Sequence, residues 1–257
     1  MKTWKLKILL LNLKVSWNKW KALSKRIQPL NDKFEKDYTV LEIIGNGNFG
    51  QVFKCKRNLP NEEEKFYAVK KSKLQFISYK DRVAKEEEIR KWQIITNNTK
   101  NMPREDSHCI DLYEAWEENG YIFSSSEYWE NGNLAEYLKK LKDKLKKKDI
   151  YNYISDMAKA IKQVHEWGII HMDIKPDNFL VKGDLKIKLA DFGLAINFDN
   201  SEEESGNANI PKRNKLIDIS EGDASYLAPE LLNFNPKVSP KIDVFRYVWV
   251  REICSLW

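Results

Sequence analysis

Four side chains of complementary chemistry lie near one another in the second half of the chain. The stretch His171–Asn178 contains an acid at Asp173, an amine at Lys175 and an amide at Asn178, and a second acid, Asp191, follows thirteen residues after Asn178. Transfer of a phosphoryl group requires a carboxylate that accepts the proton of the attacking hydroxyl, and metal ions held against the phosphates. Asp173 fits the first role, and Asn178 and Asp191 fit the second. The spacing therefore indicates phosphoryl transfer.

The residues on either side of this stretch favour a catalytic interpretation over a structural one. A lone His-x-Asp is most often a buried histidine with a structural aspartate. Here Ile169–Ile170 precedes the stretch and Phe179–Val181 follows it. Both segments are expected to be short strands that bracket a loop, which is the context that this motif requires.

A glycine-rich segment in the first half of the chain is typical of a phosphate-binding loop. Val40–Ile44 alternates like a strand, and a strand pattern resumes at Val52. Glycines between them let the backbone approach phosphates, while the same spacing also marks dinucleotide sites and ordinary hairpins. Dinucleotide sites continue into a helix, so the strand that follows here favours a different nucleotide site. The residues expected to bind the nucleotide are Gly45, Asn46, Gly47, Asn48, Phe49 and Gly50.

A lysine at the end of an apolar strand is expected to bind the phosphates. Phe66–Lys70 has the pattern of a buried strand, and a lysine that leaves such a strand needs an anion at its tip. Lys70 is preferred to Lys71 because side chains alternate across a strand, so the two ammonium groups would point to opposite faces.

A glutamate on the next helix is the expected partner of Lys70. Asp81–Ile95 is a charged helical run that contains three consecutive glutamates. Glu88 is chosen because it lies beside the apolar residues of the run, whereas Glu86 and Glu87 are expected on a solvated face.

Taken together, these motifs resemble the protein kinase family over about residues 38–245. Within that family the chain most resembles the Wee kinases, which restrain mitosis. The resemblance implies an α+β fold with two lobes: a small β-rich lobe that carries one helix, and a larger, mostly helical lobe. It implies ATP and Mg²⁺ as cofactors. The segments that carry the closer resemblance are Ile44–Cys55, Tyr67–Lys73, Glu114–Glu117, His171–Pro176 and Glu221–Asp223.

The resemblance also assigns roles to individual residues. Lys70, Glu88, Asp173, Lys175 and Asn178 would be catalytic, and Asn178 and Asp191 would bind the metal. Tyr121–Glu127 would be a strand that leads into a hinge whose backbone binds adenine. Further residues implied in nucleotide binding are Val52, Ala68 and Leu180 against the base, Ser126 at the entrance to the pocket behind it, Glu127 and Trp129 in the hinge, and Asp191.

The resemblance implies a protein substrate. Wee kinases phosphorylate the inhibitory tyrosine in the glycine-rich loop of cyclin-dependent kinases, so a cyclin-dependent kinase and a role in the cell cycle are implied here. Two segments, Asp191–Ala195 and Ala228–Glu230, follow the general kinase pattern instead. A serine/threonine kinase of other specificity therefore stays open. An alternative of a different class is a non-catalytic binding module, or a truncated fragment, with the shape of a kinase.

The chain divides into a basic leader and one expected domain. Residues 1–37 carry ten Lys/Arg and three Asp/Glu, a net charge of +7, so with +6 overall the remainder carries −1. The kinase region, 38–257, is therefore near neutral, and no nucleic-acid partner is expected. Its small lobe is expected at about 38–127 and its large lobe from about 130. After Asp243–Phe245, which resembles the start of the helix that anchors the catalytic loop, the chain departs from the family pattern, and the large lobe is expected to be truncated.

Helical patterns and cysteine usage complete the prediction. Helices are expected over 133–145 and 151–167. Three scattered cysteines, Cys55, Cys109 and Cys254, indicate a reducing compartment without a disulfide framework or a zinc site. No apolar run is long enough to cross a bilayer. We expect a monomeric protein in the nucleus, the cytoplasm or both.

The helix expected over 151–167 has an apolar face. It is expected to bury Ile154, Met157, Ala158, Ile161 and Val164.

Overall fold

The computed structural model describes residues 32–47, 50–59, 65–73, 75, 79–141, 146–183, 186–198, 226–232 and 238–255. These residues form two compact units. The first comprises the described part of Met1–Ser78 together with Tyr113–Ser125, and the second comprises the described parts of Tyr79–Leu112 and Ser126–Trp257. Strands dominate the first unit and helices the second, which confirms the predicted α+β class.

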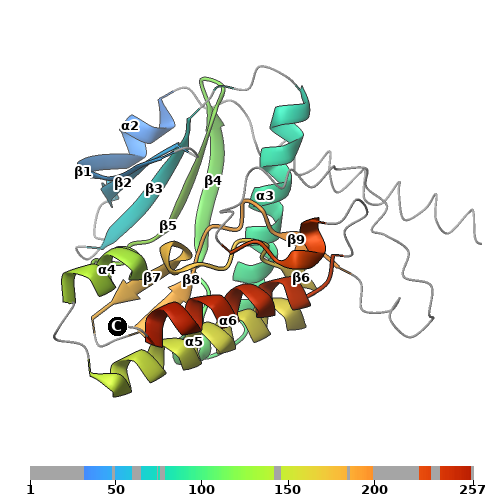
Figure 1. The fold of residues 1–257 in the computed structure, drawn as a ribbon. Coiled ribbons are helices and arrows are strands. Elements are labelled where there is room, and N and C mark those ends of the chain that lie inside the picture. The colour runs from blue at the N-terminus through green and yellow to red at the C-terminus, as the bar shows by residue number, and fades with distance from the viewer. Residues whose placement is uncertain are drawn as a thin grey trace, which may run out of the picture. The chain divides into compact units, whose positions relative to one another are not determined.

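The first unit is built on a five-stranded sheet, shown in Figure 1. A short helix, α2 (Lys33–Asp37), precedes it. Both β1–β2 and β2–β3 are antiparallel pairs, so the strands predicted on either side of the glycine-rich loop are present and form a hairpin. In the order in which they lie side by side, the strands are β1 (Tyr38–Gly47), β2 (Gly50–Arg57), β3 (Phe66–Ser72), β5 (Tyr121–Glu127) and β4 (Leu112–Glu118).

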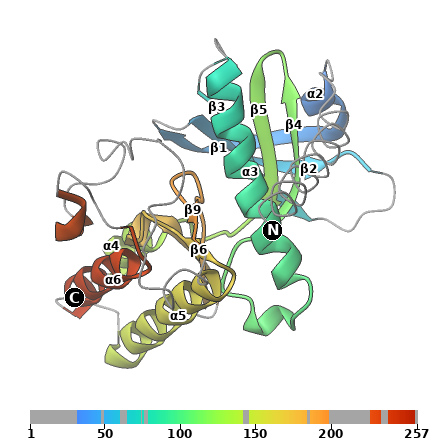
Figure 2. The same cartoon turned by 90° about the vertical axis from the view of Figure 1, so that its right-hand side faces the viewer.

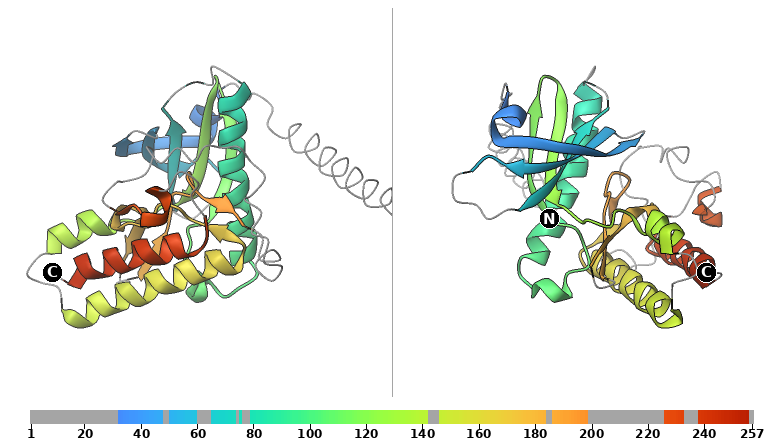
Figure 3. Two further views of the ribbon diagram at one scale, coloured as in Figure 1. Left: turned by 45° about the vertical axis from the view of Figure 1, so that its right-hand side comes forward. Right: turned by 90° about the vertical axis from the view of Figure 1, so that its left-hand side faces the viewer.

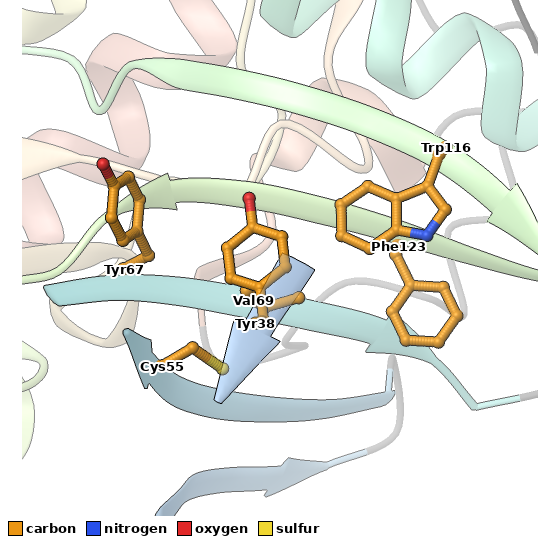
Figure 4. Close-up of a cluster of buried hydrophobic side chains, with 6 residues drawn as sticks. All are labelled: Tyr38, Cys55, Tyr67, Val69, Trp116 and Phe123. Carbon is orange, nitrogen blue, oxygen red and sulfur yellow. The ribbon is translucent and has the colours of Figure 1, made fainter. Parts of the chain in front are cut away.

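An aromatic cluster forms the core of the first unit (Figure 4). The Trp116 ring is stacked between the rings of Tyr38 and Phe123, with centroid distances of 5.7 and 5.2 Å. Tyr67 and Val69 of β3 are buried in the same cluster. Because side chains alternate across a strand, Ala68 and Lys70 belong to the opposite face of β3.

A half-buried acid ties α2 to the sheet. The Glu114 carboxylate accepts a hydrogen bond of 2.6 Å from the Tyr38 hydroxyl, and it lies 3.1 Å from the Lys33 ammonium and 3.3 Å from the Arg57 guanidinium. Burial and the neighbouring carboxylate raise the pKa of Tyr38, so the phenol stays protonated and keeps donating. Glu114 belongs to one of the segments that carry the closer kinase resemblance, and here it has a structural role.

The second unit contains four helices of more than one turn among its described residues, which are α3 (Tyr79–Thr99), α4 (Leu134–Leu141), α5 (Lys147–Glu166) and α6 (Lys241–Ser255). Helices α5 and α6 run side by side, as both views of Figure 3 show. The Tyr247 hydroxyl of α6 donates a 3.3 Å hydrogen bond to the Ile154 carbonyl of α5. The described residues also include three short 3₁₀ turns, η1 (Arg104–Asp106), η3 (Pro176–Asn178) and η7 (Pro229–Leu232).

Two small antiparallel pairs of strands complete the second unit. β6 (Ile169–Ile170) pairs with β9 (Ile196–Asn197) and lies beside α5 (Figure 2). β7 (Phe179–Lys182) pairs with β8 (Lys186–Leu189). The strands β6 and β7 therefore bracket the loop that contains Asp173, which confirms the predicted context of this motif. No helix that the structure describes combines the length and the apolar composition needed to cross a bilayer.

The predicted apolar stripe of α5 is partly wrong. Met157, Ile161 and Val164 are buried as expected, but Ile154 and Ala158 are only half-buried. The buried face is turned toward the neighbouring strands and includes Ile150, Tyr153 and Ala160 instead. Ala158 faces an apolar cavity of about 540 Å³ that α5 shares with Val244 and Tyr247 of α6.

We expected helix α3 within the 38–127 lobe. Its contacts instead make it part of the second unit. The indole nitrogen of Trp92 donates a 2.7 Å hydrogen bond to the Ile110 carbonyl, and the Lys91 ammonium donates to the Ala195 carbonyl. The carboxyl-terminal half of the helix is thereby fixed to the segment that follows β8.

Candidate active site

A carboxylate on α6 fixes the start of the loop between β6 and β7. Asp243 is fully buried, and its carboxylate oxygens accept hydrogen bonds from the backbone N–H of His171 at 2.7 Å and of Met172 at 2.9 Å. The His165 ring nitrogen lies 2.9 Å from the same carboxylate. Met172 has a φ of 68°, a left-handed conformation that is unfavourable for a side chain of this size. These charge-assisted bonds hold the loop in that conformation.

The loop gathers three of the predicted catalytic residues around one carboxylate. Asp173 is 6% exposed, and its Oδ2 lies 2.8 Å from the Lys175 ammonium and 2.8 Å from the Asn178 amide nitrogen. The same amide also donates to the backbone carbonyl of Asp173 at 2.6 Å. Sequence reasoning missed a fourth residue, Arg246 on α6. Its Nη1 lies 3.3 Å from Oδ1 of Asp173. This carboxylate is thus surrounded by donors and positive charge.

The hairpin of β7 and β8 brings the two predicted metal ligands to the same end. Phe179 pairs with Leu189, and the Ala190 N–H donates a 2.8 Å hydrogen bond to the Asn178 carbonyl. Asn178 and Asp191 therefore flank the paired residues. Asp191 has a φ of 59°, and the Gly193 N–H lies 3.4 Å from its Oδ1.

Asn178 and Asp191 suit magnesium in chemistry and in number. Magnesium prefers oxygen ligands and is usually bound through one or two carboxylates together with substrate phosphates. Among the residues that the structure describes, no group of three or more His, Cys, Asp or Glu side chains could hold a metal. A pair of oxygen donors that substrate phosphates would complete matches this mode of magnesium binding.

An aromatic column links α3 to the Asp191–Gly193 segment. The Phe192 ring meets the His171 ring edge-on at 5.3 Å and the Trp92 ring at 6.1 Å. The His171 Nε2 lies 3.0 Å from the Ala190 carbonyl, which fixes the imidazole against the backbone just before Asp191. The position of α3 and the conformation of this segment are thereby coupled.

Glu88 lies one turn before Trp92 on α3. Of the three consecutive glutamates its side chain is the least exposed, at 12% compared with 21% for Glu86 and 26% for Glu87. A methyl group on Gly193 would come within 3.7 Å of the Glu88 Oε1, so this carboxylate lies beside the Asp191–Gly193 segment. It pairs with the Lys85 ammonium at 2.8 Å.

Lys70 and Lys71 have different surroundings, as strand alternation predicts. The Lys71 ammonium lies 4.3 Å from the centre of the Tyr121 ring and 5.6 Å from that of Phe123. Lys70 pairs across the sheet with Val52, so these two side chains share the opposite face. Lys70 and Glu88 belong to different compact units, and their pairing stays a prediction.

The glycine-rich segment is the hairpin between β1 and β2. Gly45 pairs with Val52, Asn46 with Gln51, and Gly47 with Gly50. At Gly50 the φ is 135°, and an added Cβ would lie 2.0 Å from the Lys71 carbonyl oxygen, so only glycine fits. The predicted tip residues Asn48 and Phe49 lie outside the described part of the chain, as does the segment Glu221–Asp223.

The predicted hinge follows β5 directly. Ser126 is 7% exposed at the end of that strand. The Glu127 carboxylate accepts hydrogen bonds from the Asp111 N–H and the Lys188 ammonium, both at 3.0 Å, and from the Trp129 indole at 3.1 Å. This side chain therefore has a structural role that the sequence did not reveal. Leu180, expected against the base, is half-buried on β7.

Comparison with known proteins places these features in one family. The protein kinase domain family matches residues 38–250 of the chain. The membrane-associated tyrosine- and threonine-specific cdc2-inhibitory kinase wee-1.3 of Caenorhabditis elegans is 34% identical over 81% of this chain. A mitosis inhibitor protein kinase of Candida albicans is 28% identical over 80%, and the NUAK family SNF1-like kinase 2 of Rattus norvegicus is 26% identical over 80%.

The chain spans only part of these relatives, with 27%, 16% and 29% of their respective lengths covered. The family match nevertheless includes the glycine-rich hairpin, Lys70, the loop around Asp173, Asp191 and most of α6. The chain therefore belongs to the protein kinase family, and it is similar to Wee kinases within that family.

Proposed function

We propose that the chain transfers the terminal phosphoryl group of ATP to a hydroxyl group of a protein. The observation that carries this proposal is the arrangement around Asp173, a buried carboxylate 2.8 Å from both Lys175 and Asn178. Asp173 accepts the proton of the attacking hydroxyl, and Lys175 stabilises negative charge near the transferred group. Catalysis of this reaction depends mainly on positioning and on charge neutralisation, which these residues supply.

ATP and Mg²⁺ are the proposed cofactors. Asn178 and Asp191 would hold the metal, which neutralises the phosphates when it is bound. The backbone of Gly45–Gly50 and the Lys70 ammonium would bind the phosphates, with Glu88 as the partner of Lys70. Val52, Ala68 and Leu180 would contact the base, and the backbone of Glu127 and Trp129 would bind its polar edge.

The proposed substrate is the inhibitory tyrosine of a cyclin-dependent kinase. The support is similarity, since the Caenorhabditis elegans relative is named as a tyrosine- and threonine-specific cdc2-inhibitory kinase and the Candida albicans relative as a mitosis inhibitor. A specific observation favours a second candidate, a serine/threonine kinase of other specificity. The segment Ala228–Glu230 follows the general kinase pattern, and a relative from Dictyostelium discoideum that is named as a probable serine/threonine-protein kinase is 31% identical over 63% of this chain.

A peptide assay tests this proposal and separates it from the alternatives. The purified chain is incubated with Mg²⁺ and labelled ATP, and with a peptide from the glycine-rich loop of a cyclin-dependent kinase. A peptide with phenylalanine in place of the tyrosine is the matched control. We expect label on the tyrosine and none on the control peptide at that position. Label on serine alone supports the second candidate, because the Caenorhabditis elegans relative is named as specific for tyrosine and threonine. Binding of ATP without any transfer identifies a non-catalytic module.

A further inference from the structure

The geometry points to Arg246 as a positioning residue that holds the carboxylate of Asp173 from α6. This inference rests on the proposed function, in which Asp173 is the catalytic base. Arg246 lies on α6 within the residues that the kinase family matches, and no motif of the sequence predicted a role for it. Its Nη1 lies 3.3 Å from Oδ1 of Asp173, and its side chain is 2% exposed.

The three partners of this carboxylate come from two different elements. Lys175 and Asn178 belong to the same loop as Asp173, and both contact Oδ2. These contacts move with the loop, so they cannot fix the carboxylate relative to the rest of the unit. Arg246 contacts the other oxygen from a helix 73 residues away in sequence. Together the two sets of contacts fix both oxygens and therefore the plane of the carboxylate.

Arg246 also acts together with Asp243. The two residues are three positions apart on α6, so they lie on the same face of the helix one turn apart. Asp243 holds the backbone of His171 and Met172, and Arg246 holds the side chain of the next residue, Asp173. One face of α6 thus fixes both the loop and the side chain that the loop presents.

The charges in this region favour an arginine. Asp173 and Asp243 are both buried carboxylates, with exposed fractions of 6% and 0%. Burying a charge is costly unless an opposite charge pairs with it. The guanidinium of Arg246 remains charged at all physiological pH values and offers several donors in a fixed plane, so it can neutralise Asp173 without changing protonation. A misplacement of about 1 Å in a catalytic group can cost roughly 10²-fold in rate.

Steady-state kinetics of three single variants test the positioning role. Arg246→Met keeps much of the side chain's volume and removes the charge and the donors, and Arg246→Lys keeps the charge. Arg251→Met removes an exposed arginine of the same helix and is the matched control. For Arg246→Met we expect kcat to fall by roughly 10- to 100-fold while KM for ATP changes by less than about two-fold. Arg246→Lys should recover part of kcat, and Arg251→Met should match the wild type. A kcat within two-fold of wild type for Arg246→Met overturns the proposal.

A stability cycle tests the contact even if no turnover is measured. Melting temperatures are compared for the wild-type chain, Arg246→Met, Asp173→Asn and the double variant. If the two side chains are paired, Arg246→Met should lower the melting temperature less in the Asp173→Asn background than in the wild type. Equal shifts in both backgrounds reject the pairing. A wild-type chain that transfers no phosphate but shows this coupling would refute the proposed function and leave the Arg246–Asp173 contact established.

Discussion

Replacing Asp243 by alanine should destabilise the second unit severely, because one carboxylate holds several groups of the catalytic loop. The Asp243 carboxylate accepts hydrogen bonds from the backbone N–H groups of His171 and Met172 at 2.7 and 2.9 Å, and it lies 2.9 Å from the Nε2 of His165. Leaving a buried donor without an acceptor costs about 1–3 kcal/mol. Two such donors therefore give an expected loss of about 2–6 kcal/mol in the free energy of unfolding, compared with about 5–15 kcal/mol for a whole domain.

Urea unfolding followed by circular dichroism measures this loss. The matched control is Glu166→Ala on α5, since Glu166 is exposed and pairs with Lys162, which is also exposed, at 3.5 Å. Such surface pairs contribute at most about 1 kcal/mol. Asp243→Asn keeps one acceptor oxygen, so its loss should lie between those of the control and Asp243→Ala. If Asp243→Ala unfolds within about 1 kcal/mol of the control, the hydrogen bonds of Asp243 do not hold the loop, and our reasoning about α6 is wrong.

Three further predictions concern single side chains. Lys70→Met should lower kcat/KM by roughly 10²–10³-fold. Lys71→Met should keep turnover and, with the loss of its cation–π contact, lower the free energy of unfolding by about 0.5–1 kcal/mol. Equal kinetics in the two variants would show that the phosphate-binding role assigned to Lys70 is wrong. Ser126→Phe should exclude ATP analogues with a bulky group on the adenine amine and still bind ATP, which competition binding measures; unchanged analogue affinity would place the pocket elsewhere. Burial lowers the pKa of His108 below 6.5 despite the nearby Asp156 carboxylate, so the stabilising contribution of the neutral imidazole is present above pH 6.5 and is lost as the pH falls through the folded-state pKa. The melting temperature should therefore fall more steeply between pH 7 and pH 5 for the wild type than for His108→Gln. Equal slopes in the two proteins would contradict this.

Local periodicity predicted the features that depend on neighbouring residues. Alternation along β3 was sufficient to place Lys70 and Lys71 on opposite faces, because strand geometry fixes that relation whatever surrounds the strand. The patterns on either side of the glycines likewise predicted the two strands that flank Gly45–Gly50. The helical period placed a helix at α5 but assigned part of its buried face wrongly. Ile154 and Ala158 are apolar and correctly spaced, yet they are only half-buried, whereas Tyr153 and Ala160 are buried.

The contacts that depend on tertiary structure could not be predicted in this way. Arg246 meets Asp173 across 73 positions, and nothing in the local sequence of either residue indicates the other. The Glu127 side chain was missed for the same reason, since its partner Lys188 is 61 positions away. Glu88 is an intermediate case: its apolar neighbours in the sequence favoured it among three adjacent glutamates, and its lower exposure in the folded helix agrees with that choice.

The central claim is that Asp173 is the base of a phosphotransfer reaction. The most direct test compares labelled-phosphate transfer from ATP by the wild-type chain, Asp173→Asn and Asp177→Asn, with ATP binding measured in parallel. Asp177 lies in the same loop but is exposed, so its substitution changes the same charge without touching the buried site. Asp173→Asn should bind ATP and lose transfer, while Asp177→Asn should retain both. Transfer by Asp173→Asn at the wild-type rate would show that Asp173 is not the base of the reaction.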